Sequence, residues 1–231
     1  MPTLRSLSRG ILCASLLSLT LPAATLASDW DRPFVTLGLG GSDSTADWTA
    51  GGTPIFALPG FQDSGTDNGL ALSAEFGRMY RNGDLLLGWT FGLTDLDHEE
   101  SRPSTEFAGD TFSTRIGPML TLAGRVGHDF GNWMVYGEAG LAVAKIDVPN
   151  QTPVCPTVCI LSLDGRSAGY VAGIGADYRI SDRYAVGINY RHIGFEDRTA
   201  SGMISSLGAP QSYEVGGEAD VLSLRLTITL G

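Results

Sequence analysis

The strongest constraint on this chain is an alternation of large apolar side chains with small or polar ones, which recurs in eight stretches. The last stretch shows it best. Leu222, Leu224 and Leu226 fall on one face, and Ser223 and Arg225 fall on the other. A period of two residues is typical of a β-strand with one apolar face. The pattern therefore predicts an all-β fold.

The segments that join the eight stretches are alternately long and short. The short ones are turns at residues 81–84, 130–132 and 180–183, and the first contains Asn-Gly, which suits a two-residue hairpin turn. Long loops on one side and short turns on the other are typical of an eight-stranded antiparallel up-and-down transmembrane β-barrel. The predicted strands cover residues 34–41, 69–80, 85–94, 112–130, 133–146, 166–179, 184–195 and 220–230.

The chain begins with the features of a secretory signal peptide. Arg5 and Arg9 precede an apolar run that is too short to cross a bilayer as a helix. Thr25-Leu26-Ala27 offers a small-x-small cleavage site, and cleavage after Ala24 is an alternative. We therefore predict a signal peptide over residues 1–27 and one outer-membrane β-barrel domain over residues 28–231.

The charge of the remaining 204 residues argues against nucleic acid as a partner. They carry 13 basic and 25 acidic side chains, a formal charge of −12, so little is available to neutralise phosphates along a strand. Their only lysine is Lys145. A soluble barrel such as a lipocalin also alternates, but its polar face meets water and would be richer in charge. The small residues and few arginines of this polar face favour a crowded lumen, with the apolar face in lipid.

Charged residues on the polar face predict ion pairs inside the barrel. An eight-stranded lumen is just wide enough for side chains to fill it, so opposite charges there must pair. We expect this network to hold the barrel together; a polar path for a narrow solute is the alternative. The predicted interior residues are Glu75, Arg115, Arg125, Glu138, Asp177, Arg191 and Arg225.

Two cysteines remain after the signal peptide, Cys155 and Cys159, inside the third long loop. An exported protein meets an oxidising compartment, which favours a disulfide that shapes the loop tip. The rival reading is a redox-active or metal-binding pair. That reading needs an electropositive setting or further ligands, and the neighbouring sequence provides neither.

Two hairpins resemble those of a known family. Residues 121–142, TLAGRVGHDFGNWMVYGEAGLA, and then residues 169–179 with 184–191, are similar to hairpins of small outer-membrane β-barrels of the OmpA-like and opacity-type porin family. The resemblance covers nearly the whole chain after the signal peptide. It implies a Gram-negative outer-membrane location, lipid and lipopolysaccharide as neighbours, and insertion by the barrel-assembly machinery. It specifies activity poorly, because one barrel fold hosts adhesins, structural proteins, channels and lipid enzymes.

The chain departs from this family at its C-terminus. Family members usually end on an aromatic residue, whereas this sequence ends in Leu230-Gly231, so we expect an atypical insertion signal. The peptidoglycan-binding domain of OmpA is also missing from the sequence, so no cell-wall tether is expected.

Histidine offers the only lead towards an enzyme. A lipid A hydrolase would need a nucleophile, a His base and an acidic group to orient it. His192, with Glu196 close behind, is the best candidate, but Gly194 stands where the deacylase family has its Ser. His98 lies in an acidic loop and His128 near a turn, without an obvious partner. We therefore predict no catalytic residue, no cofactor and no metal site.

The long loops are acidic, and their simplest role is a solvated rim that resists aggregation. Divalent-cation bridging to lipopolysaccharide is a sharper alternative, although no stretch has the ligand spacing of a calcium loop. We expect a structural and surface-interaction role, with a packed polar interior and four exterior loops that contact host or surface ligands. A narrow diffusion channel is the alternative, and a lipid A-modifying enzyme is the second.

Overall fold

The computed structural model describes residues 30–51, 60, 62–96, 98–103, 111–148, 159–204 and 209–230, and the predicted signal peptide lies outside them. None of these residues forms a helix that could span a membrane. Within these ranges the strands are β1 (Pro33–Ala50), β2 (Gln62–Asn82), β3 (Leu85–Asp95), β4 (His98–Pro103), β5 (Thr111–Phe130), β6 (Trp133–Val148), β7 (Cys159–Arg179), β8 (Tyr184–Ile204) and β9 (Ala209–Thr229).

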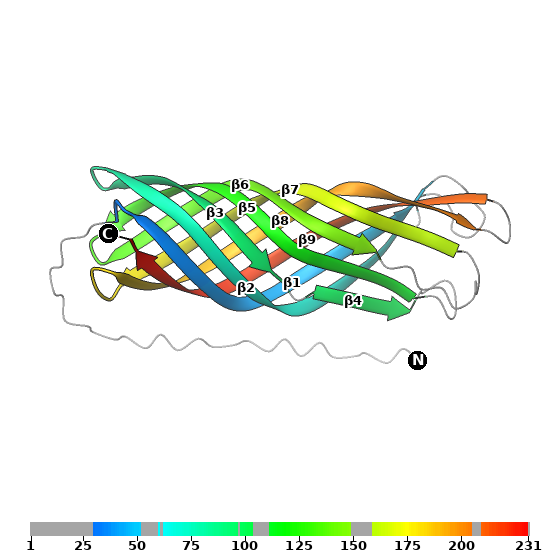
Figure 1. The fold of residues 1–231 in the computed structure, drawn as a ribbon, viewed down its shortest axis with the longest axis horizontal. Coiled ribbons are helices and arrows are strands. Elements are labelled where there is room, and N and C mark those ends of the chain that lie inside the picture. Colours follow the sequence, from blue (N-terminus) through cyan, green and yellow to red (C-terminus); the bar gives the residue numbers. More distant parts are fainter. Residues whose placement is uncertain are drawn as a thin grey trace, which may run out of the picture.

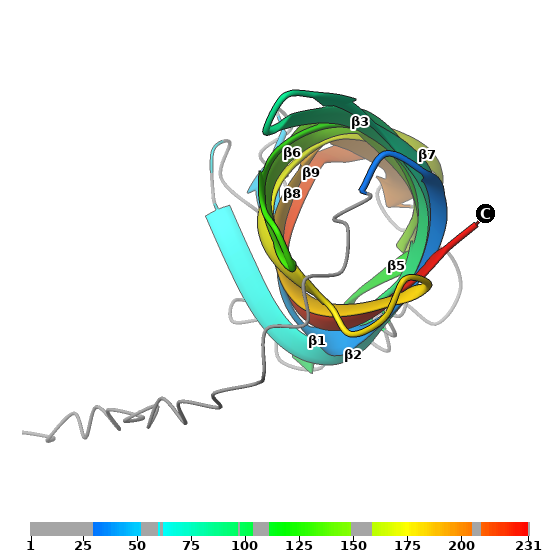
Figure 2. The ribbon, with the colours of Figure 1, turned by 90° about the vertical axis from the view of Figure 1, so that its left-hand side faces the viewer.

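The strands close into a ring (Figure 2). β1 pairs with both β2 and β9, and antiparallel pairing continues through β8, β7, β6 and β5. β3 and β4 both pair with β5, and Leu96 directly follows β3. The two strands therefore occupy one position of the barrel together. The β2–β3 and β3–β5 pairings complete the ring. The predicted eight-stranded antiparallel barrel is confirmed.

The two ends of the barrel differ. The three short turns and the end of β9 lie together at one end, on the left in Figure 1, and we call this the turn end. Gly83 and Gly131 have φ angles of +64° and +81° in two of these turns, a region that glycine enters without steric cost. The long connections leave from the opposite end, which we call the loop end.

Around the turn-side half of the barrel, apolar side chains point outward and form an apolar belt. Leu224 is 68 % exposed, and Trp133 packs against Tyr178 with ring centroids 4.8 Å apart beside the turns. This orientation contradicts the lipocalin-like alternative, in which the same face would be enclosed. Each of the eight strand positions contributes to the belt, for example through Leu39, Leu72, Leu93, Leu122, Leu141, Ile174, Ile188 and Leu224.

The loop-side half has the opposite arrangement. Its outward side chains are polar, and its inward side chains form an apolar cluster in which Ile193 and Leu96 are fully buried. The expectation of a polar interior is therefore wrong for this half. Other members of the cluster include Trp48, Ile116, Met119, Val171, Phe195, Val215 and Val221.

This reversal also explains why strands extend beyond their predicted ends. β1 continues to Ala50 instead of ending at residue 41, and β9 begins at Ala209 instead of residue 220. In β1 the apolar positions change from odd numbers, such as Leu37, to even numbers, such as Trp48. The alternation that marks the first half of the strand therefore ends within a stretch rich in Gly, Ser, Thr and Asp. Such a stretch is typical of a loop, so the sequence pattern predicted a loop there.

Candidate functional site

A layer of charged side chains crosses the lumen within the turn-side half. Glu75 from β2, Arg125 from β5, Glu138 from β6, Arg191 from β8 and Arg225 from β9 all point inward and are buried. Each occupies the phase opposite to the outward apolar residues of its strand. Because five strands contribute, the layer joins opposite sides of the barrel wall.

Glu138 is held by two guanidinium groups and one amide. Arg125 donates to its Oε2 from Nη2 at 2.7 Å and from Nε at 3.2 Å, and Arg191 Nε donates to its Oε1 at 2.6 Å. Asn189 Nδ2 donates to Oε1 at 3.3 Å and to the carbonyl oxygen of Ile174 at 3.1 Å. Both carboxylate oxygens are therefore satisfied without water.

Glu75 forms the second centre of the layer. Arg225 contacts it with both ends of its fork, Nη2 to Oε2 at 2.7 Å and Nη1 to Oε1 at 3.2 Å. Arg125 Nη2 lies 3.3 Å from Oε2, and Arg191 Nη2 pairs with Oε1. The planar, five-donor guanidinium suits such shared pairing, which a lysine could not reproduce.

Aromatic rings pack against the guanidinium groups. The Tyr136 ring centroid is 4.1 Å from Cζ of Arg125 and 5.9 Å from Cζ of Arg225, and the Phe34 centroid is 5.6 Å from Arg125. A cation over an aromatic face gains most where water is excluded. These contacts help to compensate for the removal of the charges from water.

Glycines provide the room that this layer needs. A Cβ on Gly173 would lie 3.1 Å from both Glu138 Oε1 and Arg191 Cγ. A Cβ on Gly187 would lie only 2.0 Å from Asp177 Oδ1. The glycines on the inward face therefore allow long charged side chains to lie flat across neighbouring strands.

The structure brings together five of the seven predicted interior residues. Asp177 is also buried in the lumen, but its Oδ1 accepts no hydrogen bond from the residues that the structure describes. The structure therefore places Asp177 in the lumen, and its ion pair stays a prediction. The side chain of Arg115 lies outside the described residues.

Three contributors to the lumen were missed. Tyr136 and Asn189 point inward, because their strand neighbours Val135 and Ile188 point outward. The alternation of these strands could therefore have identified both residues as part of the lumen. Arg179, also buried, packs over the ring of Trp30 at 4.2 Å near the turn end. Sequence gave no sign of this last contact, since Trp30 precedes the first strand.

A second polar cluster lies outside the barrel, at the loop-side edge of the apolar belt. His192 Nδ1 is 3.0 Å from Asp220 Oδ1, and His192 Nε2 is 3.1 Å from the Tyr170 hydroxyl. Tyr190 donates its hydroxyl to the same Asp220 oxygen at 2.7 Å. His192 contacts Asp220 and not the predicted partner Glu196. The carbonyl oxygen of Glu196 accepts a hydrogen bond from the Ser167 hydroxyl at 3.0 Å.

This outer cluster does not assemble a hydrolytic triad among the described residues, because the hydroxyl that meets His192 is a phenol. Asp220 was missed as its partner because the two residues meet only through the β8–β9 register, which the sequence pattern does not show. His128 packs against Phe130 with ring centroids 4.4 Å apart, and the side chain of His98 lies outside the described residues.

The remaining sequence hypotheses fall largely outside the described structure. Cys155 and most of the long loops are not described, and Cys159 is described only as the first residue of β7. The disulfide therefore stays a prediction. Within the described ranges, no three His, Cys, Asp or Glu side chains are grouped so that they could hold a metal ion.

An outward apolar belt around a lumen closed by buried ion pairs defines a transmembrane β-barrel protein. The chain matches the outer membrane protein beta-barrel domain over residues 11–216 and belongs to this family. Its location is therefore the outer membrane of a Gram-negative bacterium. Comparison with curated protein sequences gives no match.

Solved structures agree with this fold. OprG of Pseudomonas aeruginosa is 14 % identical, with a TM-score of 0.54 over 86 % of this chain and 97 % of that chain. The outer membrane protease OmpT of Escherichia coli is 9 % identical, with a TM-score of 0.51 over 90 % and 99 %. Neisserial surface protein A is 14 % identical, with a TM-score of 0.41 over 84 % and 97 %. For OprG and OmpT, at identities this low, the likeness establishes the fold alone.

Proposed function

We propose that this protein is a closed structural and surface-interaction barrel of the outer membrane. The observation that supports this most directly is the charged layer, which lies inside the apolar belt and links five strands. The side chains of Arg125 and Glu138 have no exposed surface at all. A lumen filled in this way supports a role in which the ion pairs stabilise a closed barrel.

The apolar cluster of the loop-side half adds a second obstacle above the charged layer. A polar solute would have to pass Ile193, Phe195 and Val215 before it reached the ion pairs. Passage would then require the arginines to leave both glutamates, which is costly in a desolvated site. We therefore favour the structural role over the narrow channel.

The surface-interaction part of the proposal rests on the outer face of the loop-side half. Outer-membrane barrels direct their short turns to the periplasm and their long loops to the exterior. With this orientation, the exposed carboxylates of Asp43, Asp47, Glu214 and Glu218 would stand above the membrane. Such a wall carries a strong negative field and suits cationic or cation-bridged partners.

Planar-bilayer recording tests the closed lumen. We expect no stable conductance from the wild type, and measurable openings from a Glu75→Ala/Glu138→Ala double variant that still inserts. A stable conductance of the wild type would instead establish a pore. Profiling of lipid A with and without the protein tests the enzyme alternative, and we expect no change in acylation.

A further inference from the structure

One strand of the loop-side half is paired on one side only. β2 pairs with β1 from Gln62 onwards, but β3 pairs with β2 only from Leu72 to Asn82. β4, which follows β3 along the chain, pairs with β5. Among the described strands, residues 62–71 of β2 therefore have no partner on the side opposite β1, and we call this side the free edge. In Figure 2 this part of β2, in cyan, stands outside the ring of the other strands.

The register shows which backbone groups the free edge presents. Gly51 donates its N–H to the carbonyl oxygen of Ser212 on β9, so odd-numbered residues of β1 direct their backbone groups to β9 and even-numbered ones to β2. Even-numbered residues of β1 lie opposite odd-numbered residues of β2. The residues of β2 that direct their N–H and C=O groups to the free edge are therefore Gln62, Ser64, Thr66, Asn68 and Leu70.

The free edge lacks common devices that keep a strand edge from pairing. Such devices include lysine, proline and bulges. Residues 62–71 contain neither lysine nor proline, and their pairing with β1 runs without a register shift. The N–H of Asn68 donates to Oδ1 of Asp67 at 2.9 Å, which is a local contact and not a ladder hydrogen bond. Within the described part of the chain, the free edge can therefore accept a further strand.

The two faces of β2 at the free edge differ in polarity. Successive residues of a strand point to opposite faces. On the inward face stand Gly65, Gly69 and Ala71, and Ala71 belongs to the apolar cluster together with Leu96. The exposed outward residues are polar but uncharged, namely Gln62, Ser64, Thr66 and Asn68. A guest strand would therefore meet apolar surroundings on one face and water on the other.

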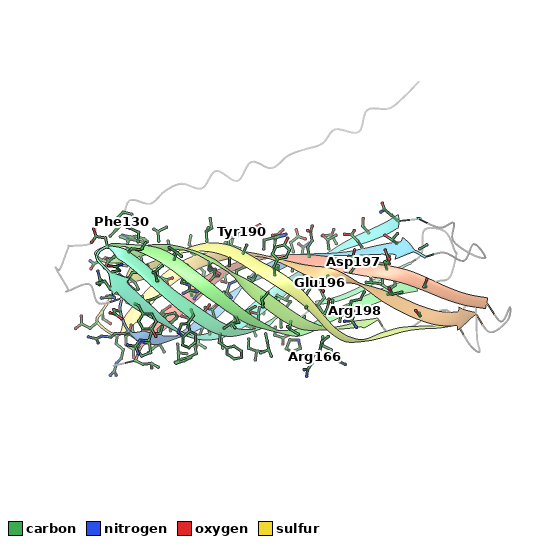
Figure 3. The ribbon with its side chains drawn as sticks, turned by 90° about the horizontal axis from the view of Figure 1, so that it is seen from above. Phe130, Arg166, Tyr190, Glu196, Asp197 and Arg198 are labelled. Carbon is green, nitrogen blue, oxygen red and sulfur yellow. The ribbon has the colours of Figure 1, made fainter. Side chains whose placement is uncertain are left out.

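The charges around the free edge are negative. Asp95, the last residue of β3, points outward at the membrane-side end of the free edge. Asp43 and Asp47 are exposed on β1, the strand next to β2. The basic side chains labelled in Figure 3, Arg166 and Arg198, lie instead on β7 and β8. Outward side chains of a guest strand would therefore be attracted if they were basic.

A second copy of this chain is a poor guest for the free edge. Copies in one membrane have the same orientation, so two β2 strands could pair only in parallel, the less stable arrangement. Both copies would also bring the same carboxylates together. The charge of the surface favours a partner of opposite sign.

We propose that the free edge of β2 binds an extended cationic peptide by strand addition. Hydrogen bonds with the backbone of β2 provide affinity, and the alternation of basic and apolar side chains in the guest provides specificity. The basic side chains meet Asp95 and the carboxylates of β1, and the apolar ones face the interior. This inference rests on the surface-interaction part of the proposed function, which places the loop end outside the cell.

The test uses the full-length protein in phosphatidylcholine nanodiscs and a synthetic peptide of alternating lysine and valine. We expect the peptide to bind in surface plasmon resonance. Methylation of its backbone nitrogens keeps the charges but removes the donors, and should weaken binding about tenfold. A glutamate–valine peptide should not bind. In NMR, the bound peptide should slow amide hydrogen exchange at Thr66 and Asn68 more than at Gly65 and Gly69, which already face β1.

Variants of the protein test the same edge. Thr66→Pro removes one N–H from the free edge and leaves the hydrogen bonds to β1, so it should weaken binding about tenfold. Thr66→Val keeps this N–H and should bind like the wild type. Asp95→Asn should weaken binding about threefold. Its matched control is Asp182→Asn, at an exposed position near the turn end, which should leave binding unchanged.

Heat-modifiable gel migration should report a folded barrel for every variant. If Thr66→Pro does not fold, the methylated peptide decides. Equal binding of the methylated peptide, or of a folded Thr66→Pro variant, would overturn strand addition and leave an electrostatic contact with the exposed carboxylates, so the proposed function would stand. Failure of both lysine peptides to bind would overturn strand addition and the attraction of cationic partners together. The conductance test of the closed lumen does not depend on either result.

Discussion

The turn-side half of the barrel has apolar side chains outside and charged side chains inside, whereas the loop-side half has carboxylates outside and an apolar interior. The same strands run through both halves: β9 presents Leu224 outward in one and Glu218 outward in the other. In each half, the outward side chains of a strand therefore match the polarity of the medium that they contact. Hydrocarbon surrounds one half, and we infer that water surrounds the other.

The interiors of the two halves are stabilised by different forces. In hydrocarbon, the burial of apolar side chains contributes little to the free energy of folding. Paired charges and close packing must therefore stabilise the wall of this half. In water, the loop-side half gains from the hydrophobic effect, as a soluble barrel does. Substitutions at matched positions can measure this difference.

The largest effect is expected from Glu138→Ala in the charged layer. It leaves Arg125, Arg191 and Arg225 with Glu75 as the only carboxylate of the charged layer, at a cost of about 3–5 kcal/mol of unfolding free energy. Denaturant titration in lipid vesicles measures the loss. Glu218→Ala, on the exposed face, should change stability by less than about 0.5 kcal/mol. Equal effects would mean that the layer does not stabilise the barrel.

Ile193→Ala tests the apolar interior of the loop-side half. Ile193 is fully buried, so its truncation should leave a cavity and cost about 2–5 kcal/mol. Ile188→Ala, on the lipid face of the same strand, should cost clearly less in the same titration, because acyl chains fill the space. The reverse order would contradict a soluble-like interior in this half.

Leu224→Arg probes the outer face of the belt. A cation there must enter hydrocarbon, and we expect a loss of about 2–4 kcal/mol near the bilayer centre. Glu218→Arg on the same strand should be nearly neutral, because that position faces water. The pair thus locates the membrane boundary on β9. A neutral Leu224→Arg would place the belt outside the membrane.

The smallest effect is expected from Tyr190→Phe at the boundary between the halves. It removes the exposed hydrogen bond from the hydroxyl to Asp220, which water can replace. The unfolding midpoint in vesicles should remain close to that of the wild type. A loss comparable to that of Leu224→Arg would instead show that the outer cluster is sheltered from water within the headgroups.

Much of the architecture was predictable from sequence alone. Alternation such as that of residues 222–230, and turn residues such as Asn82-Gly83, depend on neighbours in the chain, so they identified the barrel and which face of each strand points inward. Phase likewise indicated that Glu75 and Arg225 share the lumen. Strand bounds on the loop side were not predictable, because polarity reverses there within one strand.

Tertiary structure alone decided which charges meet. Glu75 and Arg225 are 150 residues apart, and their pairing depends on how β1 sets the register of β2 against β9. The contact of His192 with Asp220 depends in the same way on the β8–β9 register. Local sequence determined the period and facing of each strand, because those follow from adjacent residues. The partners across the ring were decided only by closure of the barrel, which fixes every register at once.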